Sequence, residues 1–143
     1  MELPPFHAAI VVHDLDASRL FYGGLLGCQE GRCSDGWVDF NLYGHQLVCH
    51  LDSSADAGWH GRHRTSPVDG EDVPVPHFGV VLSMPDWQHL AKRLRRRQTQ
   101  FVIDPRIRFV EETGEQATLF IADPSGNVLE FKAFSDPENL FAS

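Results

Sequence analysis

The chain has 143 residues, a hydrophobic fraction of 42% and a formal charge of −8. This length and composition suit one folded domain and exclude a multidomain machine or a disordered tail. The acidic balance opposes a nucleic-acid partner, because duplex binding needs a cationic surface. Since three cysteines lack disulfide or zinc spacing and the N-terminal stretch shows no export or membrane signal, we expect a cytoplasmic protein without a membrane partner.

The first third of the sequence predicts a strand, a helix and three further strands. Residues 6–12 form a short apolar run, and Asp14 then offers a cap to a helix that ends before Gly27. Turn residues next separate three apolar segments. These segments, each predicted as a strand, are 28–33, 37–43 and 46–51. The pattern is a βαβββ module over about residues 5–51.

Residues 52–75 interrupt this pattern. They are rich in Ser, Gly, Asp, Pro and His and show no periodicity. Connections within compact domains are usually far shorter. We therefore expect a long loop that acts either as a linker or as a lid over a site.

A second module follows over about residues 76–134, with a tail at 135–143. It begins with a strand at 76–83 and an amphipathic helix after Pro85. The further strands are predicted at 101–103, 107–111, 117–122 and 127–134.

The two modules form an internal repeat. Their openings, FHAAIVVHDLDASRLFY and PHFGVVLSMPDWQHLAK, align without a gap, so that His77 follows His7 by 70 residues. The sequence thus predicts an α+β fold in which two related βαβββ modules make up a single domain, residues 1–143.

Two histidines and a glutamate are candidate metal ligands. His7 and His77 each begin an apolar strand, where a single imidazole is usually a core side chain bonded to a carbonyl group. Glu130 lies among apolar residues of the last strand, where a buried carboxylate needs a cation or a metal ion. Pairing with Lys132 is the simpler alternative for Glu130. Two histidines and one carboxylate can hold one face of a six-coordinate ion and leave positions open for oxygen and substrate.

Three other histidines have two interpretations each. His50 closes the first module as Glu130 closes the second, at an even offset from a turn glycine, so it is either a fourth ligand or a proton carrier. His60 and His63 lie in the long loop, where each is either a general base or a solvated side chain.

Three residues of the second module are candidates for binding a substrate. Arg106 and Arg108 share one face of a strand, from which either can clamp an anionic substrate. Phe120 can line the site and stack on a ring, although strand aromatics are more often core residues. The alternative for the two arginines is pairing with neighbouring acidic residues, namely Glu111, Glu112 and Glu115.

The motifs resemble those of the vicinal oxygen chelate superfamily, which includes glyoxalase I, extradiol dioxygenases and bleomycin resistance proteins. The resemblance rests on FHAAIVVHDLDASRLFYGGLLG, HFGVV and DPSGNVLEF, covers nearly the whole chain and is nearest the small extradiol-dioxygenase-related branch. It implies two modules in a cupped, partly open mixed β-barrel. It also implies metal ligands at His7, His77 and Glu130, with His50 at a fourth position where glyoxalase-like members have glutamate.

The function that this resemblance implies is an extradiol-type dioxygenase with Fe(II), acting on a small catechol-like or vicinal-oxygen substrate. His50 or His63 then accepts a substrate proton. One alternative is a glyoxalase-like lyase or isomerase with Zn(II), Ni(II) or Mn(II). A second alternative is a metal-free protein that sequesters a small molecule. The resemblance further implies a homodimer, in which the modules pair within one chain or between chains.

Overall fold

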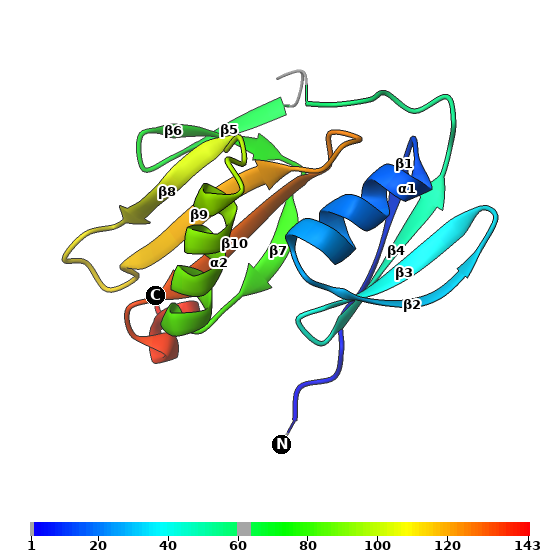
Figure 1. Ribbon diagram of the computed structural model, residues 1–143. Coiled ribbons are helices and arrows are strands. Elements are labelled where there is room, and N and C mark those ends of the chain that lie inside the picture. The colour runs from blue at the N-terminus through cyan, green and yellow to red at the C-terminus, as the bar shows by residue number, and fades with distance from the viewer. Residues whose placement is uncertain (1, 60–63) are drawn as a thin grey trace. The chain divides into compact units, whose positions relative to one another are not determined.

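The computed structural model describes residues 2–59 and 64–143 and has the predicted α+β organisation of two βαβββ modules (Figure 1). These residues form two compact units. The first unit holds the residues as far as Trp59 together with Asp123–Asn127, and the second holds residues 64–122 together with Val128–Ser143. Within the described residues, no helix combines the length and the apolar character that crossing a membrane requires.

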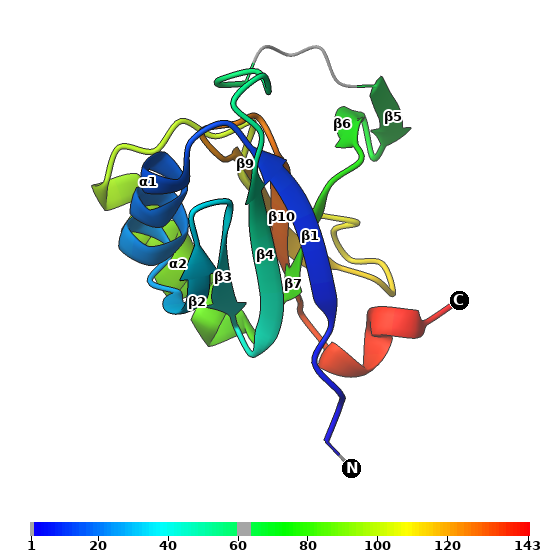
Figure 2. The same cartoon turned by 90° about the vertical axis from the view of Figure 1, so that its right-hand side faces the viewer.

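The first unit contains a four-stranded sheet in the order β1-β4-β3-β2, with β1 and β4 parallel and side by side (Figure 2). Asp14 caps the helix as predicted, because its carboxylate accepts a hydrogen bond from the backbone of Ala17. The helix continues as a π-helical segment, Arg19–Leu25, that buries Phe21 and Tyr22. The elements are β1 (His7–Val12), α1 (Leu15–Ser18), β2 (Gln29–Ser34), β3 (Trp37–Leu42) and β4 (His45–Leu51).

The turn at residues 123–126 belongs to this first unit, where buried Asp123 holds it in place. The carboxylate accepts hydrogen bonds from the hydroxyl of Tyr22 at 2.7 Å and from the backbone amides of Ser125 and Asn127. The side-chain amide of Asn127 donates to the same carboxylate and to the carbonyl of Val11. These bonds satisfy a buried charge and fix the turn against the unit.

The second unit repeats the topology of the first, with a sheet in the order β7-β10-β9-β8 and with β7 parallel to β10. The helix is amphipathic, as predicted, and its buried face includes Trp87, whose indole donates to the carbonyl of Phe131. The shared strand order confirms the internal repeat. The elements are β7 (Phe78–Val81), α2 (Met84–Arg96), β8 (Ile103–Arg108), β9 (Gln116–Ala122) and β10 (Val128–Phe134).

The predicted loop contains an additional hairpin, β5 (Arg64–Val68) and β6 (Glu71–Val75). The turn between these strands is Asp69-Gly70, whose φ angles are 46° and 78°. Two successive positive φ angles match the twist of a tight hairpin, and Asp-Gly is a typical sequence for it. The Asp-Gly dipeptide could have predicted this hairpin, but we expected a loop without strands here.

Two further segments differ from the prediction. β8 is one strand where two were expected at 101–103 and 107–111, and its register shifts between Ile103 and Arg106. Pro105 lies within the shift, since proline cannot donate a hydrogen bond to a sheet ladder. The chain ends with a short 3₁₀ helix, Pro137–Phe141, that the periodicity did not predict.

Candidate functional site

The second unit brings two of the candidate ligands together. Glu130 in β10 is registered with Gly79 of β7, two residues after His77. The Nε2 atom of His77 lies 3.2 Å from Oε1 of Glu130. Thr118 donates a hydrogen bond of 2.5 Å to the other carboxylate oxygen, and Lys132 lies 3.5 Å from Oε1. Glu130 therefore has a partner on each oxygen, and Lys132 does neighbour it, as the simpler interpretation predicted.

The pKa values of both side chains in this pair are shifted. The hydrogen bond with Glu130 raises the pKa of His77 against the opposing effect of burial. For Glu130, burial acts to raise the pKa, but the hydrogen bonds from His77 and Thr118 and the charge of Lys132 prevail and lower it. Glu130 is thus held as a carboxylate with His77 facing it.

The tautomer of His77 follows from its other ring nitrogen. Nδ1 lies 2.6 Å from the carbonyl oxygen of Pro74. A carbonyl group can only accept, so Nδ1 carries the proton and donates. In the neutral ring, the lone pair is therefore on Nε2, the atom that faces Glu130.

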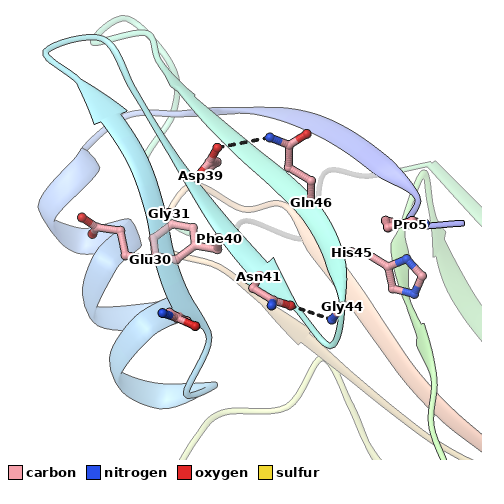
Figure 3. Close-up of a pocket in the computed structure, with 10 residues that line it drawn as sticks. Pro5, Glu30, Gly31, Asp39, Phe40, Asn41, Gly44, His45 and Gln46 are labelled. Atoms are coloured by element: carbon pink, nitrogen blue, oxygen red, sulfur yellow. Dashed lines mark hydrogen bonds between the residues drawn. The ribbon is translucent and has the colours of Figure 1, made fainter.

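In the first unit, a hydrogen bond at Nδ1 likewise orients the ring of His7. Its Nδ1 lies 2.9 Å from Oε1 of Gln46. In turn, Nε2 of Gln46 donates to Asp39 at 3.1 Å (Figure 3). Because the Asp39 carboxylate can only accept, the amide nitrogen of Gln46 must face it and the amide oxygen must face His7. Nδ1 of His7 is then the donor, and its Nε2 has the free lone pair.

The carboxylate of Asp39 is itself held firmly. Asp39 is buried within β3, and the backbone amide of Arg32 donates to it at 2.7 Å. A Cβ atom at Gly31 would overlap this carboxylate, so glycine leaves room for it. A pocket of about 410 Å³ lies beside Asp39 and Gln46 (Figure 3). Its lining residues are Pro5, Gln29, Glu30, Gly31, Asp39, Phe40, Asn41, Gly44, His45 and Gln46.

The register corrects the equivalence that we expected between His50 and Glu130. Ala9 is registered with Val48 as Gly79 is registered with Glu130, so Val48 is the counterpart of the glutamate. His50 is exposed and registered with Val11, four residues along β1 from His7. That spacing is roughly 13 Å along a strand. The error arose because His50 lies farther from its turn glycine than Glu130 lies from its own. The role of His50 as a ligand or a proton carrier stays a prediction. His60 and His63 lie outside the described residues.

Arg106 and Arg108 are on one face of β8, as strand parity predicts, but they have different surroundings. Arg106 pairs with Glu71 at 2.6 Å and with Asp69 at 3.2 Å, both in the β5–β6 hairpin. Its partners are therefore not the glutamates at 111, 112 and 115 that the sequence offered. Arg108 is buried at 3% exposure.

Phe120 is fully buried and lies between two of the candidate residues. Its ring meets the ring of His77 edge to face, with centroids 5.0 Å apart. The guanidinium carbon of Arg108 lies 5.7 Å from the centre of the same ring. Phe120 thus joins the His77–Glu130 pair to Arg108 through direct contacts.

Sequence reasoning missed the residues that orient the candidate ligands: Asp39, Gln46 and Thr118. The signal for Asp39 was a charged residue between the apolar Val38 and Phe40 in a buried strand. Across the described ranges, no group of three or more His, Cys, Asp or Glu side chains is gathered closely enough to hold a metal ion.

The family comparison matches residues 5–131 to the Glyoxalase/Bleomycin resistance protein/Dioxygenase superfamily. The chain therefore belongs to this superfamily, as its motifs predicted. A search of curated proteins gave no match.

Solved structures agree with this assignment. A glyoxalase/bleomycin resistance protein/dioxygenase from Alicyclobacillus acidocaldarius is 32% identical, with 96% of each chain covered and a TM-score of 0.78. The fosfomycin resistance protein FosX from Listeria monocytogenes is 16% identical, with a TM-score of 0.66 over 98% of this chain and 100% of that chain. A glyoxalase/dioxygenase from Nostoc punctiforme is 17% identical, with a TM-score of 0.62 over 93% and 92%. The last two show a shared fold.

Proposed function

We propose that this protein is a metal-dependent dioxygenase of the extradiol type, with His7, His77 and Glu130 as ligands to Fe(II). The observation that supports it most directly is the paired orientation of the histidines. Each has Nδ1 occupied as a hydrogen-bond donor to an oxygen atom, which leaves the lone pair of the neutral ring on Nε2, the atom that would bind the metal. His7 supplies the third ligand from the same chain or from a second copy in a homodimer.

The distance between Nε2 of His77 and Oε1 of Glu130 is suitable for two ligands of one metal ion. Two ligands at adjacent corners of an octahedral ion, with bonds of about 2.1 Å, lie roughly 3.0 Å apart. The measured separation of Nε2 and Oε1 is 3.2 Å. Thr118 donates to the other oxygen of Glu130, which supports monodentate binding through Oε1.

The protein's own residues would position the substrate and move its proton. Fe(II), when bound, supplies open positions at which a catechol-like substrate and O₂ can meet. Phe120 packs edge to face against His77 and so helps to hold the imidazole ring in position. His50 or His63 is the candidate acceptor for a hydroxyl proton, because a neutral imidazole has a nitrogen lone pair that can take up a proton.

Metal analysis combined with a substrate screen tests this function. Protein from cells supplied with Fe, Mn, Ni and Zn, purified without air or chelator, is expected to contain about one iron per chain. With catechols in air, it is expected to consume one O₂ per ring opened, as measured with an oxygen electrode and by ultraviolet absorbance.

Other outcomes of that experiment contradict the proposal in distinct ways. Stoichiometric zinc, nickel or manganese without oxygen uptake would indicate a lyase or isomerase that uses a Lewis acid. Absence of any metal would indicate a binding protein for a small molecule.

Replacing Gln46 with leucine is expected to weaken metal binding by about 10- to 100-fold, the usual cost of losing a hydrogen-bond partner of a ligand. Leucine removes the acceptor that fixes the His7 tautomer while nearly keeping the volume. Isothermal titration with Fe(II) under nitrogen measures the affinity. Nitrogen NMR of the metal-free protein reports whether Nδ1 of His7 keeps its proton.

Gln29→Leu is the matched control, since Gln29 lines the same pocket and is exposed. It is expected to leave both the affinity and the His7 tautomer unchanged. Equal affinities for Gln46→Leu and the unmodified protein would contradict the role of Gln46.

A further inference from the structure

Arg108 carries a buried positive charge that no acidic side chain of the described residues neutralises. Its exposed fraction is 3%. Among the described residues, its Nε and Nη2 atoms have no hydrogen-bond partner. Its Nη1 atom donates a long hydrogen bond, 3.4 Å, to the carbonyl of Val68, and its guanidinium lies over Phe120. A buried charge without an opposite charge strongly destabilises a fold, so its retention calls for another role.

The two unpartnered atoms form a single recognition edge. In a guanidinium group, the Nε–H bond and one Nη2–H bond point the same way and are spaced to meet two oxygens of one carboxylate or phosphoryl group. Arg108 has this edge free, while its remaining nitrogen has a protein acceptor.

Arg108 differs from two neighbouring cations of this unit, Arg106 and Lys132. Arg106, two residues earlier on the same face, is already neutralised by Glu71 and Asp69. Lys132 is neutralised by Glu130. Of these three neighbouring cations, Arg108 is the one that has no acidic partner among the described residues.

The position of Arg108 connects it to the proposed metal site. Phe120 contacts both the Arg108 guanidinium and the His77 ring. A molecule that places an anionic group at Arg108 and a reacting oxygen near His77 would therefore have to span the width of this ring. The β5–β6 hairpin contacts the guanidinium on its other side, where Nη1 donates to the carbonyl of Val68.

We propose that Arg108 is the anion-binding residue of this site and that the substrate is a small organic anion bearing a carboxylate or phosphoryl group. This inference rests on the proposed function and names the substrate class of the same site. The Nε–Nη2 edge binds two oxygens of the anion, and the rest of the substrate extends past Phe120 toward His77 and Glu130.

Anion titration of the full-length protein tests this inference, with and without bound metal. The probes are benzoate, phenylphosphonate and inorganic phosphate, with benzamide as the uncharged match to benzoate. Isothermal titration and the rise in Tm on adding each probe measure binding. We expect at least one organic anion to bind and benzamide not to bind. Arg108→Gln is expected to weaken that binding by at least about 10-fold, the contribution of a charge-assisted pair of hydrogen bonds.

Two more variants at this position keep the test decisive. Arg108→Lys retains the charge but lacks the two-pronged edge, so intermediate binding is expected. Arg108→Met is expected to raise the Tm in the absence of anions, because it removes a buried, unneutralised charge, and to abolish the Tm rise that anions cause. Arg95→Gln, on the exposed surface of α2, is the control of equal charge change and should bind like the unmodified protein.

The outcomes separate this inference from the proposed function. Anion binding that Arg108→Gln does not weaken, benzamide binding as strong as benzoate binding, or no anion binding would each overturn the role of Arg108. If iron still binds in any of these cases, the metal site stands. Arg108-dependent anion binding in a protein that never binds iron would support the inference and contradict the dioxygenase proposal.

Discussion

Replacing His77 with alanine is expected to lower metal affinity by more than about 100-fold while the chain stays folded. Losing a partner of a ligand costs 10- to 100-fold, and losing the ligand itself costs more. His77 is only half-buried, so its loss leaves a partly exposed space. Glu130 keeps its interactions with Thr118 and Lys132 in this variant. Elemental analysis of anaerobically purified protein measures occupancy, and circular dichroism with thermal unfolding measures the fold.

His89→Ala is the matched control, because His89 lies exposed on α2. It should retain the metal content of the unmodified protein. Full occupancy in His77→Ala would mean that the proposed ligand set is wrong. Loss of metal together with loss of the fold would be resolved by His77→Gln, which retains a polar side chain at this place and is expected to fold without binding metal tightly.

Replacing Gly79 with alanine is expected to destabilise the protein by about 3 kcal/mol or more, the upper range for overpacking. The added Cβ would overlap the backbone carbonyl oxygen of Glu130, and the obstacle is a strand backbone that cannot rotate away. The parallel strands β7 and β10 must then separate where Glu130 is held. Urea unfolding measures the stability, and metal titration of the folded fraction should show weakened binding.

Gly114→Ala is the control for that substitution, because a Cβ at Gly114 would meet no atom within 4 Å. It is expected to change the free energy of unfolding by less than about 0.5 kcal/mol, as surface substitutions do. If Gly79→Ala were equally neutral, β7 and β10 could not lie as close at this point as the structure has them.

The sequence predicted the repeat because both modules show the same local patterns of apolar and turn residues. Apolar alternation marks strands, the spacing of Trp87, Leu90, Ala91 and Leu94 marks α2, and turn residues mark the ends of elements. His7 and His77 were recognisable because they occupy the same place in two aligned openings. The resemblance to a known superfamily rested on the same motifs, and the family match confirmed it.

The errors arose where strand pairing, not local pattern, decides the neighbours. His50 and Glu130 both follow a turn glycine at an even offset, which fixes the face but not the distance along the strand. The register with β1 places Val48, not His50, opposite the counterpart of Gly79. The β5–β6 hairpin was missed because its strands are short and polar, although Asp69-Gly70 marked the turn.

By itself, the sequence determined the two modules, the family and the residue types able to hold a metal, since these depend on order and periodicity along the chain. Only the tertiary structure decided what each polar atom faces. It places Gln46 and Asp39 beside His7, the carbonyl of Pro74 beside His77 and Glu71 beside Arg106. Within the described residues, it leaves Nε and Nη2 of Arg108 without a hydrogen-bond partner. Hydrogen bonds act over about 3 Å between residues distant in sequence, so their partners are fixed only when the strands pair and the side chains pack.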